Sequence, residues 1–150
     1  MKIEKANSDD HKILTEITKK SKAFWGYSEE QIVQWNDVLT ITKEYIQTNF
    51  AYKLIKENQV IGYYSYFNAE TYIVKLDNLF VLPEYIGKGF GNYLMDDFLN
   101  RINENRDIKK VLLDADPNAE KFYQKFGFKT IGQLETSIKN RFLPIMELNL

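Results

Sequence analysis

The sequence predicts an α/β protein of the α+β kind, with a mixed, mostly antiparallel central sheet of about six to seven strands, one parallel βαβ unit and helices on both faces. Three observations support this fold class. Apolar residues recur at helical spacing in the first third of the chain, runs of β-branched and aromatic residues follow, and a glycine-rich turn separates a strand pattern from a second helical stripe. The chain has 150 residues, 44% of them apolar, so we expect residues 1–150 to form a single domain.

Three helices are expected near the N-terminus, after a short apolar stretch around Ile3. The first follows the cap-forming run Ser8–Asp10 and ends near Gly26. A capping box at Ser28–Gln31 opens the second, and a third, short helix begins at Thr42. The apolar residues of the first helix lie roughly on one face: Ile13, Leu14, Ile17 and Phe24.

The chain then changes to a strand pattern. Residues 52–55 and Val60–Phe67 are rich in aromatic and β-branched side chains, and Thr71–Val81 is a longer run of the same kind. The turns expected between them are short, at Glu57–Gln59 and Asn68–Glu70. Short connections predict an antiparallel meander.

The second half of the chain predicts the parallel unit. Pro83 ends the strand Thr71–Val81, a helical apolar stripe occupies positions 90, 94, 95, 98, 99 and 102, and Lys110–Ala115 is a short apolar strand. This order makes the two strands a parallel pair with a right-handed crossover.

The C-terminal part predicts one more helix and a hairpin. Asp116 and Pro117 form a suitable helix start, and Gly127 a suitable end. Phe128–Ile131 and Phe142–Leu148 are expected to pair as the last two strands.

The glycine-rich turn predicts an anion site. Glycines allow left-handed backbone and a close approach of the main chain to a bulky anion, and unpaired amides at a helix start attract phosphate. The glycines at positions 87, 89 and 91 do not fit a Walker loop, because Gly87-Lys88 is followed by Gly89 and not by serine or threonine. They do not fit the dinucleotide fingerprint either, because no third glycine stands three residues after the second. A plain tight turn is the alternative. A pyrophosphate is the expected guest, with Lys88 as an added charge.

Two segments resemble the GCN5-related N-acetyltransferase (GNAT) superfamily. Leu79–Gly91 reads LFVLPEYIGKGFG, similar to the family's signature of a strand, V-x-P-x-x, Arg or Gln, two residues and Gly-x-Gly or Gly-x-Ala. Asp116–Phe128 reads DPNAEKFYQKFGF, similar to the family's later helix ending in Y-x-x-x-G-F. The resemblance covers nearly the whole chain. It implies a fold that binds acetyl-CoA between the strands Thr71–Val81 and Lys110–Ala115.

The resemblance also implies residues that bind acetyl-CoA as cosubstrate. Backbone amides of Ile86, Gly87, Lys88, Gly89, Phe90 and Gly91 would hold the pyrophosphate, and the backbone of Leu79, Phe80 and Val81 would hold the pantetheine arm. Two positions depart from the family pattern. Ile86 stands where Arg or Gln is usual, and Asp116 stands where Asn is frequent, with Asn118 as a candidate substitute. Both Asp116 and Asn118 are retained as cofactor-binding candidates.

The chemistry implied is attack of a neutral amine on a thioester. Tyr123 is the candidate general acid for the leaving thiolate and also a cofactor-binding candidate, with a purely structural place in the core as the alternative. Asp77 is the first candidate base, and a solvated or structurally paired carboxylate is the alternative. The candidates that line the acceptor site are aromatic, with closure of the core as their alternative: Phe24, Trp25, Tyr27 and Tyr64.

Composition narrows the remaining classes. The chain has no cysteine, so disulfides, thiolate metal sites and cysteine nucleophiles are excluded, and we expect no metal. A formal charge of -1 argues against a nucleic-acid partner, and no apolar stretch is long enough to span a membrane. We expect a cytoplasmic N-acetyltransferase, monomeric or homodimeric, acting on a small-molecule or peptide amine. A non-catalytic acyl-CoA-binding regulatory module is the alternative.

Overall fold

The structure, a computed structural model, describes residues 1–136 and 141–150. The described residues form a sheet of seven strands in the order β1-β2-β3-β4-β5-β7-β6. The strands are β1 (Lys2–Lys5), β2 (Phe50–Lys56), β3 (Gln59–Glu70), β4 (Ile73–Val81), β5 (Lys110–Asp114), β6 (Lys129–Glu135) and β7 (Phe142–Asn149). The pair β4–β5 is parallel, and the pairs β1–β2, β2–β3, β5–β7 and β6–β7 are antiparallel.

Six helices and three 3-10 turns connect the described strands. The helices are α1 (His11–Phe24), α2 (Glu29–Gln34), α3 (Asn36–Leu39), α4 (Lys43–Thr48), α5 (Phe90–Asn103) and α6 (Glu120–Gln124). The 3-10 turns are η1 (Ser8–Asp10), η2 (Pro83–Tyr85) and η3 (Pro117–Ala119). In the part of the chain that the structure covers, none of these helices has the length and apolar character that crossing a membrane requires.

The chain divides into two compact units, and each is described here by itself. The first unit comprises residues 1–66 and 78–101, and the second comprises residues 67–77 and 102–150. Strands β3 and β4 contribute residues to both units.

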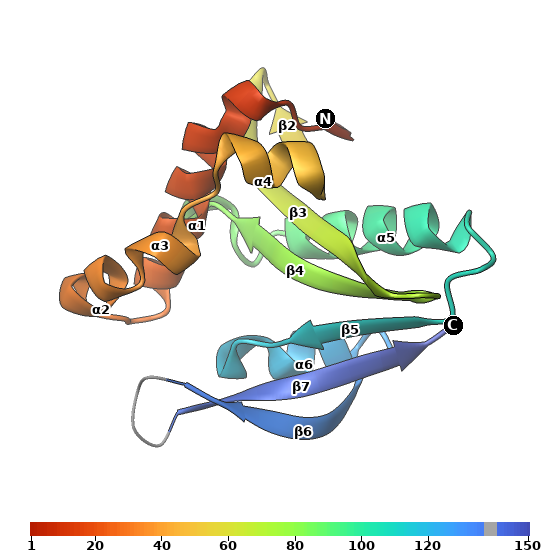
Figure 1. Ribbon diagram of the computed structural model, residues 1–150. Coiled ribbons are helices and arrows are strands. Elements are labelled where there is room, and N and C mark those ends of the chain that lie inside the picture. Colours follow the sequence, from red (N-terminus) through yellow and green to blue (C-terminus); the bar gives the residue numbers. More distant parts are fainter. Residues whose placement is uncertain (137–140) are drawn as a thin grey trace. The chain divides into compact units, whose positions relative to one another are not determined.

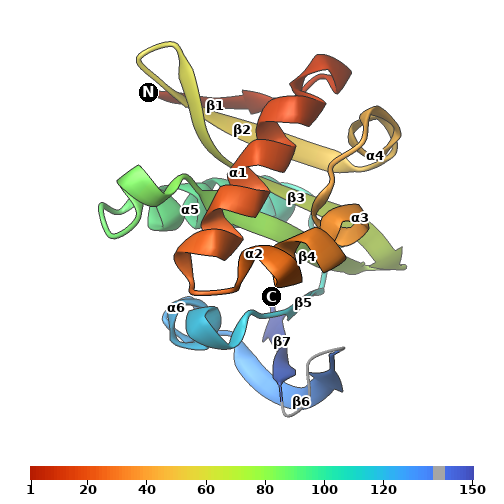
Figure 2. The same cartoon turned by 90° about the vertical axis from the view of Figure 1, so that its left-hand side faces the viewer.

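In the first unit, helices cover both faces of the sheet. The hydroxyl of Tyr63 bonds that of Thr18 on α1, whereas the hydroxyl of Tyr64 bonds Asp97 on α5. Because neighbouring side chains of a strand point to opposite faces, α1 and α5 lie on opposite sides of β3. Figure 2 shows α1 in front of these strands and α5 behind them. The core between these layers is mainly apolar. Its most buried side chains include Leu14, Ile17, Leu54, Ile61, Leu94, Met95 and Phe98.

In the second unit, α6 lies against one face of the strands β5, β7 and β6 (Figure 1). The parallel pairing joins Ile73 to Lys110 and Val74 to Val111 at the start of β4. The buried side chains on the helix side include Val111, Leu113, Tyr123, Phe128 and Met146. The order of strand, helix and parallel strand confirms the predicted βαβ unit, and β6 and β7 confirm the predicted hairpin.

Some element boundaries differ from those predicted. The second expected helix is divided into α2 and α3, because the backbone turns at Trp35, where φ is -89° and ψ is 10°. The turn expected at Asn68–Glu70 is wrong, since β3 continues to Glu70 and the chain reverses at Thr71 and Tyr72. Tyr72 takes a left-handed φ of 68°, which a sequence pattern does not announce for tyrosine.

Candidate functional site

The turn before α5 is built from two successive local structures. Backbone bonds from the amides of Tyr85 and Ile86 to the carbonyls of Leu82 and Pro83 close the η2 turn. Gly87 and Gly89 then adopt φ values of 80° and 89°. Such left-handed backbone disfavours any residue with a Cβ, so the glycines are needed for this path of the chain.

Among the described residues, no acceptor is present for the backbone amides of residues 87–92. The first backbone bond of α5 runs from the Tyr93 amide to the Gly89 carbonyl, at 3.1 Å, so the helix leaves the amides of residues 90–92 unpaired. Within the described residues, no hydrogen bond involves the amides of residues 87–89 either. The Ile86 amide differs, because it donates to the Pro83 carbonyl at 3.2 Å. The available donors therefore start at Gly87.

The turn is also open to a ligand. A Cβ built on Gly87 or on Gly89 meets no atom within 4 Å, so the surface over both glycines is not filled by the protein. Unpaired amides at the start of a 14-residue helix also carry its positive dipole end. The residues present here thus fit a polyanionic group such as a pyrophosphate.

The positively charged side chain of the turn, Lys88, lies at the surface. Lys88 is exposed, and its ammonium lies 5.9 Å from the centre of the Tyr85 ring. The Tyr85 ring packs edge-on against Phe90 at 5.6 Å. Lys88 is therefore a charge at the rim of the turn.

The end of β4 is held from both faces. On the side of α5, Gly62 has no side chain, and a Cβ there would stand 2.8 Å from the carbonyl oxygen of Phe80. On the side of α1, the hydroxyl of Ser21 donates to the carbonyl of Val81 at 2.7 Å. Leu79 and Phe80 are half-buried. Substitution of Gly62 or loss of the Ser21 bond would therefore move the backbone that the family resemblance assigns to the pantetheine arm.

Three predicted acceptor-site residues lie at the end of α1 or just after it. Phe24 and Trp25 are 51% and 43% exposed, and their rings meet edge-on at 5.2 Å. Tyr27 packs edge-on against Trp35 at 5.1 Å. The ammonium of Lys22 lies 5.8 Å from the Tyr27 ring and 5.7 Å from the Phe80 ring. The structure thus brings Tyr27 and Phe80, near the end of β4, close to the same lysine.

Tyr64 does not join this group. It is completely buried, and its hydroxyl donates to Asp97 at 2.7 Å and accepts from Arg101 at 3.0 Å. Burial, reinforced by the hydrogen bond to Asp97, raises the pKa of Tyr64. Because it faces α5 and not α1, the structure separates Tyr64 from the other predicted acceptor-site residues.

In the second unit, Tyr123 lies on α6 with 9% of its surface exposed. Its ring packs against Phe122 at 5.2 Å and Phe128 at 5.8 Å, and its carbonyl accepts the amides of Phe126 and Phe128. Burial raises the pKa of the Tyr123 phenol, and the negative charge of Asp116 raises it further. The phenol is therefore protonated throughout the neutral range and can only donate a proton there.

Asp116 forms the start of the segment that carries Tyr123. One carboxylate oxygen accepts both the backbone amide and the side-chain amide of Asn118, each at 2.9 Å. The other accepts a hydrogen bond from the Arg141 guanidinium at 3.2 Å. The predicted capping role of Asp116 is confirmed, and the Asn118 side chain points back to Asp116.

Asp77 is exposed and lies within β4. It interacts with another group of the protein, so it is not a free carboxylate. Its role as a base remains a prediction. Among residues 1–136 and 141–150, no group of three or more His, Cys, Asp or Glu side chains is placed to hold a metal ion.

The sequence matches the model of a family described as acetyltransferase (GNAT) domain over residues 25–149. The chain belongs to this GNAT acetyltransferase family. A search of curated proteins returns no match to the chain.

Solved structures with the GNAT fold resemble the chain over its full length. The paia N-acetyltransferase from Thermoplasma acidophilum, in complex with coenzyme A, has a TM-score of 0.77 at 23% identity and covers 100% of both chains. A GCN5-related N-acetyltransferase from Rhodopseudomonas palustris has a TM-score of 0.77 at 21% identity, covering 99% of this chain and 95% of its own. The ribosomal-protein-S18-alanine N-acetyltransferase from Escherichia coli has a TM-score of 0.72 at 17% identity, covering 99% and 92%. At these identities the likeness shows the fold.

Sequence reasoning missed Ser21 and Gly62 near the predicted GNAT site, and it did not predict the partner of Arg141. Ser21 and Gly62 act on β4 from elements far away in the chain, and Arg141 pairs with Asp116, 25 residues earlier. The glycine in an otherwise aromatic strand was the one signal available, since glycine inside a strand often marks a close approach of another backbone. No sequence pattern around Ser21 or Arg141 indicates which residue it bonds.

Proposed function

We propose that this GNAT acetyltransferase is an acetyl-CoA-dependent N-acetyltransferase. It moves an acetyl group to a primary amine of a small molecule or peptide by direct attack in a ternary complex, and residues 1–150 act as one cytoplasmic domain. The observation that carries the proposal is the row of unpaired amides over residues 87–92, with the open surface above Gly87 and Gly89.

The residues proposed to hold the cofactor act mainly through the main chain. The amides from Gly87 to Asn92 bind the pyrophosphate, and the backbone of Leu79–Val81 binds the pantetheine arm. Bound acetyl-CoA supplies a thioester as the acetyl donor. Asp116 and Asn118 remain cofactor-binding candidates, although their side chains already bond each other. The amide of Ile86 already donates to the Pro83 carbonyl, so Ile86 contributes to the site mainly through its position in the turn.

The proton transfers are assigned to two side chains. Tyr123 holds a proton on its hydroxyl at neutral pH, because burial raises the pKa of the phenol, and we assign it the role of general acid. Asp77, an exposed carboxylate, is assigned the role of accepting the proton of the amine. Phe24, Trp25 and Tyr27 are proposed to contact the apolar part of the acceptor.

Two proteins of similar fold support an amine acceptor: a ribosomal-protein-alanine N-acetyltransferase from Brucella melitensis and the ribosomal-protein-S18-alanine N-acetyltransferase from Escherichia coli. Both classes of amine, peptide and small molecule, therefore belong in the test.

The test has two steps. Thermal unfolding with and without acetyl-CoA measures binding, and a ligand at about 100 times its Kd should stabilise the fold by about 2.7 kcal/mol. Thiol release over a panel of peptide and small-molecule amines then measures turnover, with mass spectrometry identifying the acetylated atom. Absence of any thermal shift would overturn the proposal. A shift without thiol release from any amine would support the non-catalytic acyl-CoA-binding module instead.

A further inference from the structure

The helix that carries Tyr123, α6, is too short to be stable by itself. α6 has only five residues, and isolated helices shorter than about 12–15 residues are marginal in water. Its orientation must therefore come from contacts with other elements of the second unit. The structure shows where these contacts are.

Two side-chain tethers join this segment to the hairpin of β6 and β7. The hydroxyl of Thr130 on β6 donates to the Glu120 carboxylate, at the start of α6, at 2.6 Å. Before the helix, the Asp116 carboxylate accepts from Arg141, the residue directly before β7. The Arg141 carbonyl in turn accepts the hydroxyl of Thr136 at 2.8 Å, so Arg141 is fixed at both its side chain and its backbone.

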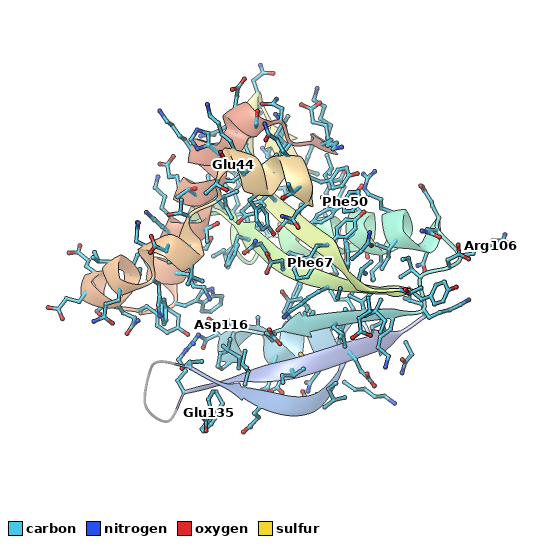
Figure 3. All side chains as sticks on the ribbon, in the orientation of Figure 1. Glu44, Phe50, Phe67, Arg106, Asp116 and Glu135 are labelled. Carbon is cyan, nitrogen blue, oxygen red and sulfur yellow. The ribbon has the colours of Figure 1, made fainter. Side chains whose placement is uncertain are left out.

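The Asp116–Arg141 pair is largely removed from water. The side chains of Arg141 and Asp116 are 14% and 12% exposed. An ion pair that is largely removed from water is screened less than an exposed pair, so it can hold its two segments together. Figure 3 shows Asp116 at the end of β5, where the chain leaves the sheet for η3 and α6.

We propose that Arg141 is a positioning residue for Tyr123: by pairing with the Asp116 carboxylate, it anchors the η3–α6 segment, which carries Tyr123, to the start of β7. This inference rests on the proposed function, in which Tyr123 donates a proton. Asp116 is the N-cap of η3, and η3 leads directly into α6, so the Arg141 pair acts at the start of the segment that carries Tyr123. Arg141 acts through Asp116 and is not assigned a contact with either substrate.

The test compares Arg141→Met with Arg141→Lys, which keeps the positive charge and can still pair with the Asp116 carboxylate. With both substrates saturating and at a temperature where every variant is folded, Arg141→Met should lower kcat about tenfold, since misplacement of a catalytic group is costly. Both KM values should change less than twofold, and Arg141→Lys should keep most of the wild-type kcat. Arg106→Met, at an exposed arginine of the same unit, is the matched control and should behave as wild type.

A second readout needs no cofactor. In protein labelled with ¹³C-ring tyrosine, the Tyr123 resonance is the one missing from Tyr123→Phe. It should move in Arg141→Met and stay near its original position in Arg141→Lys. Wild-type kcat in folded Arg141→Met, or an equally low kcat in folded Arg141→Lys, would overturn the inference alone. Absence of thiol release by the wild-type protein with every amine would instead overturn the proposed function.

Discussion

The glycine-rich turn before α5 and the segment from Asp116 to α6 present their functional groups in different ways. The turn offers main-chain amides, and its shape is set by Gly87 and Gly89 within a few residues of sequence. The later segment offers a side chain, Tyr123, whose position depends on partners from β6 and β7. A site made of backbone is defined locally, whereas a site made of a side chain on a short helix is defined by the surrounding tertiary structure. Substitutions should therefore affect the two regions differently.

The largest effect is expected at Tyr123. Tyr123→Phe removes the proposed proton donor while keeping the buried ring, so kcat should fall about 100-fold or more with little change in the melting temperature or in acetyl-CoA binding. Steady-state thiol release and thermal unfolding measure both quantities. Tyr64→Phe is the matched control: the loss of its bonds to Asp97 and Arg101 should lower stability by about 1 kcal/mol and leave kcat unchanged. An unchanged kcat in Tyr123→Phe would remove Tyr123 from the proposed mechanism.

A smaller effect is expected in the turn. Gly89→Ala forces an alanine into backbone with φ of 89°, at a cost of about 1–2 kcal/mol, so acetyl-CoA affinity should fall roughly tenfold. Isothermal titration calorimetry measures the affinity. Gly132→Ala is the matched control, because Gly132 is not left-handed and its added Cβ would lie in ordinary contact, 3.7 Å from Ile145. Equal affinities in the two variants would show that the shape of the turn does not govern binding.

A still smaller effect is expected at Lys88. Its side chain is exposed at the rim of a turn whose amides are unpaired, so Lys88→Ala should raise the Kd of acetyl-CoA only about two- to fivefold, as for one screened surface charge. The difference should shrink in high salt. A loss greater than that of Gly89→Ala would mean that the lysine charge dominates over the backbone.

The pH dependence of kcat should show almost no effect of Tyr123 ionisation below about pH 10. Burial and the charge of Asp116 raise the pKa of its phenol above the ordinary value, and a group with a raised pKa keeps its proton as the pH increases. The kcat profile should therefore show no alkaline decline from Tyr123 up to about pH 10, the unperturbed tyrosine pKa. A decline centred below pH 9 in wild type, absent from the residual activity of Tyr123→Phe, would contradict this assignment.

The sequence by itself determined the fold class, the parallel unit and the anion-binding turn. Helical and strand periodicities are local, and so is the requirement for glycine at left-handed positions, so each could be inferred from neighbouring residues. The resemblance of two short segments then indicated the family, which the match over residues 25–149 confirms.

Only the tertiary structure decided which distant side chains support the candidate site. The face of β3 to which Tyr64 points, the bond of Ser21 to β4 and the pairing of Arg141 with Asp116 all depend on strand register and on helix placement. A shift of one residue in register would send Tyr64 to the opposite face. The energy of such contacts is shared between residues far apart in the chain, and therefore no local pattern records it.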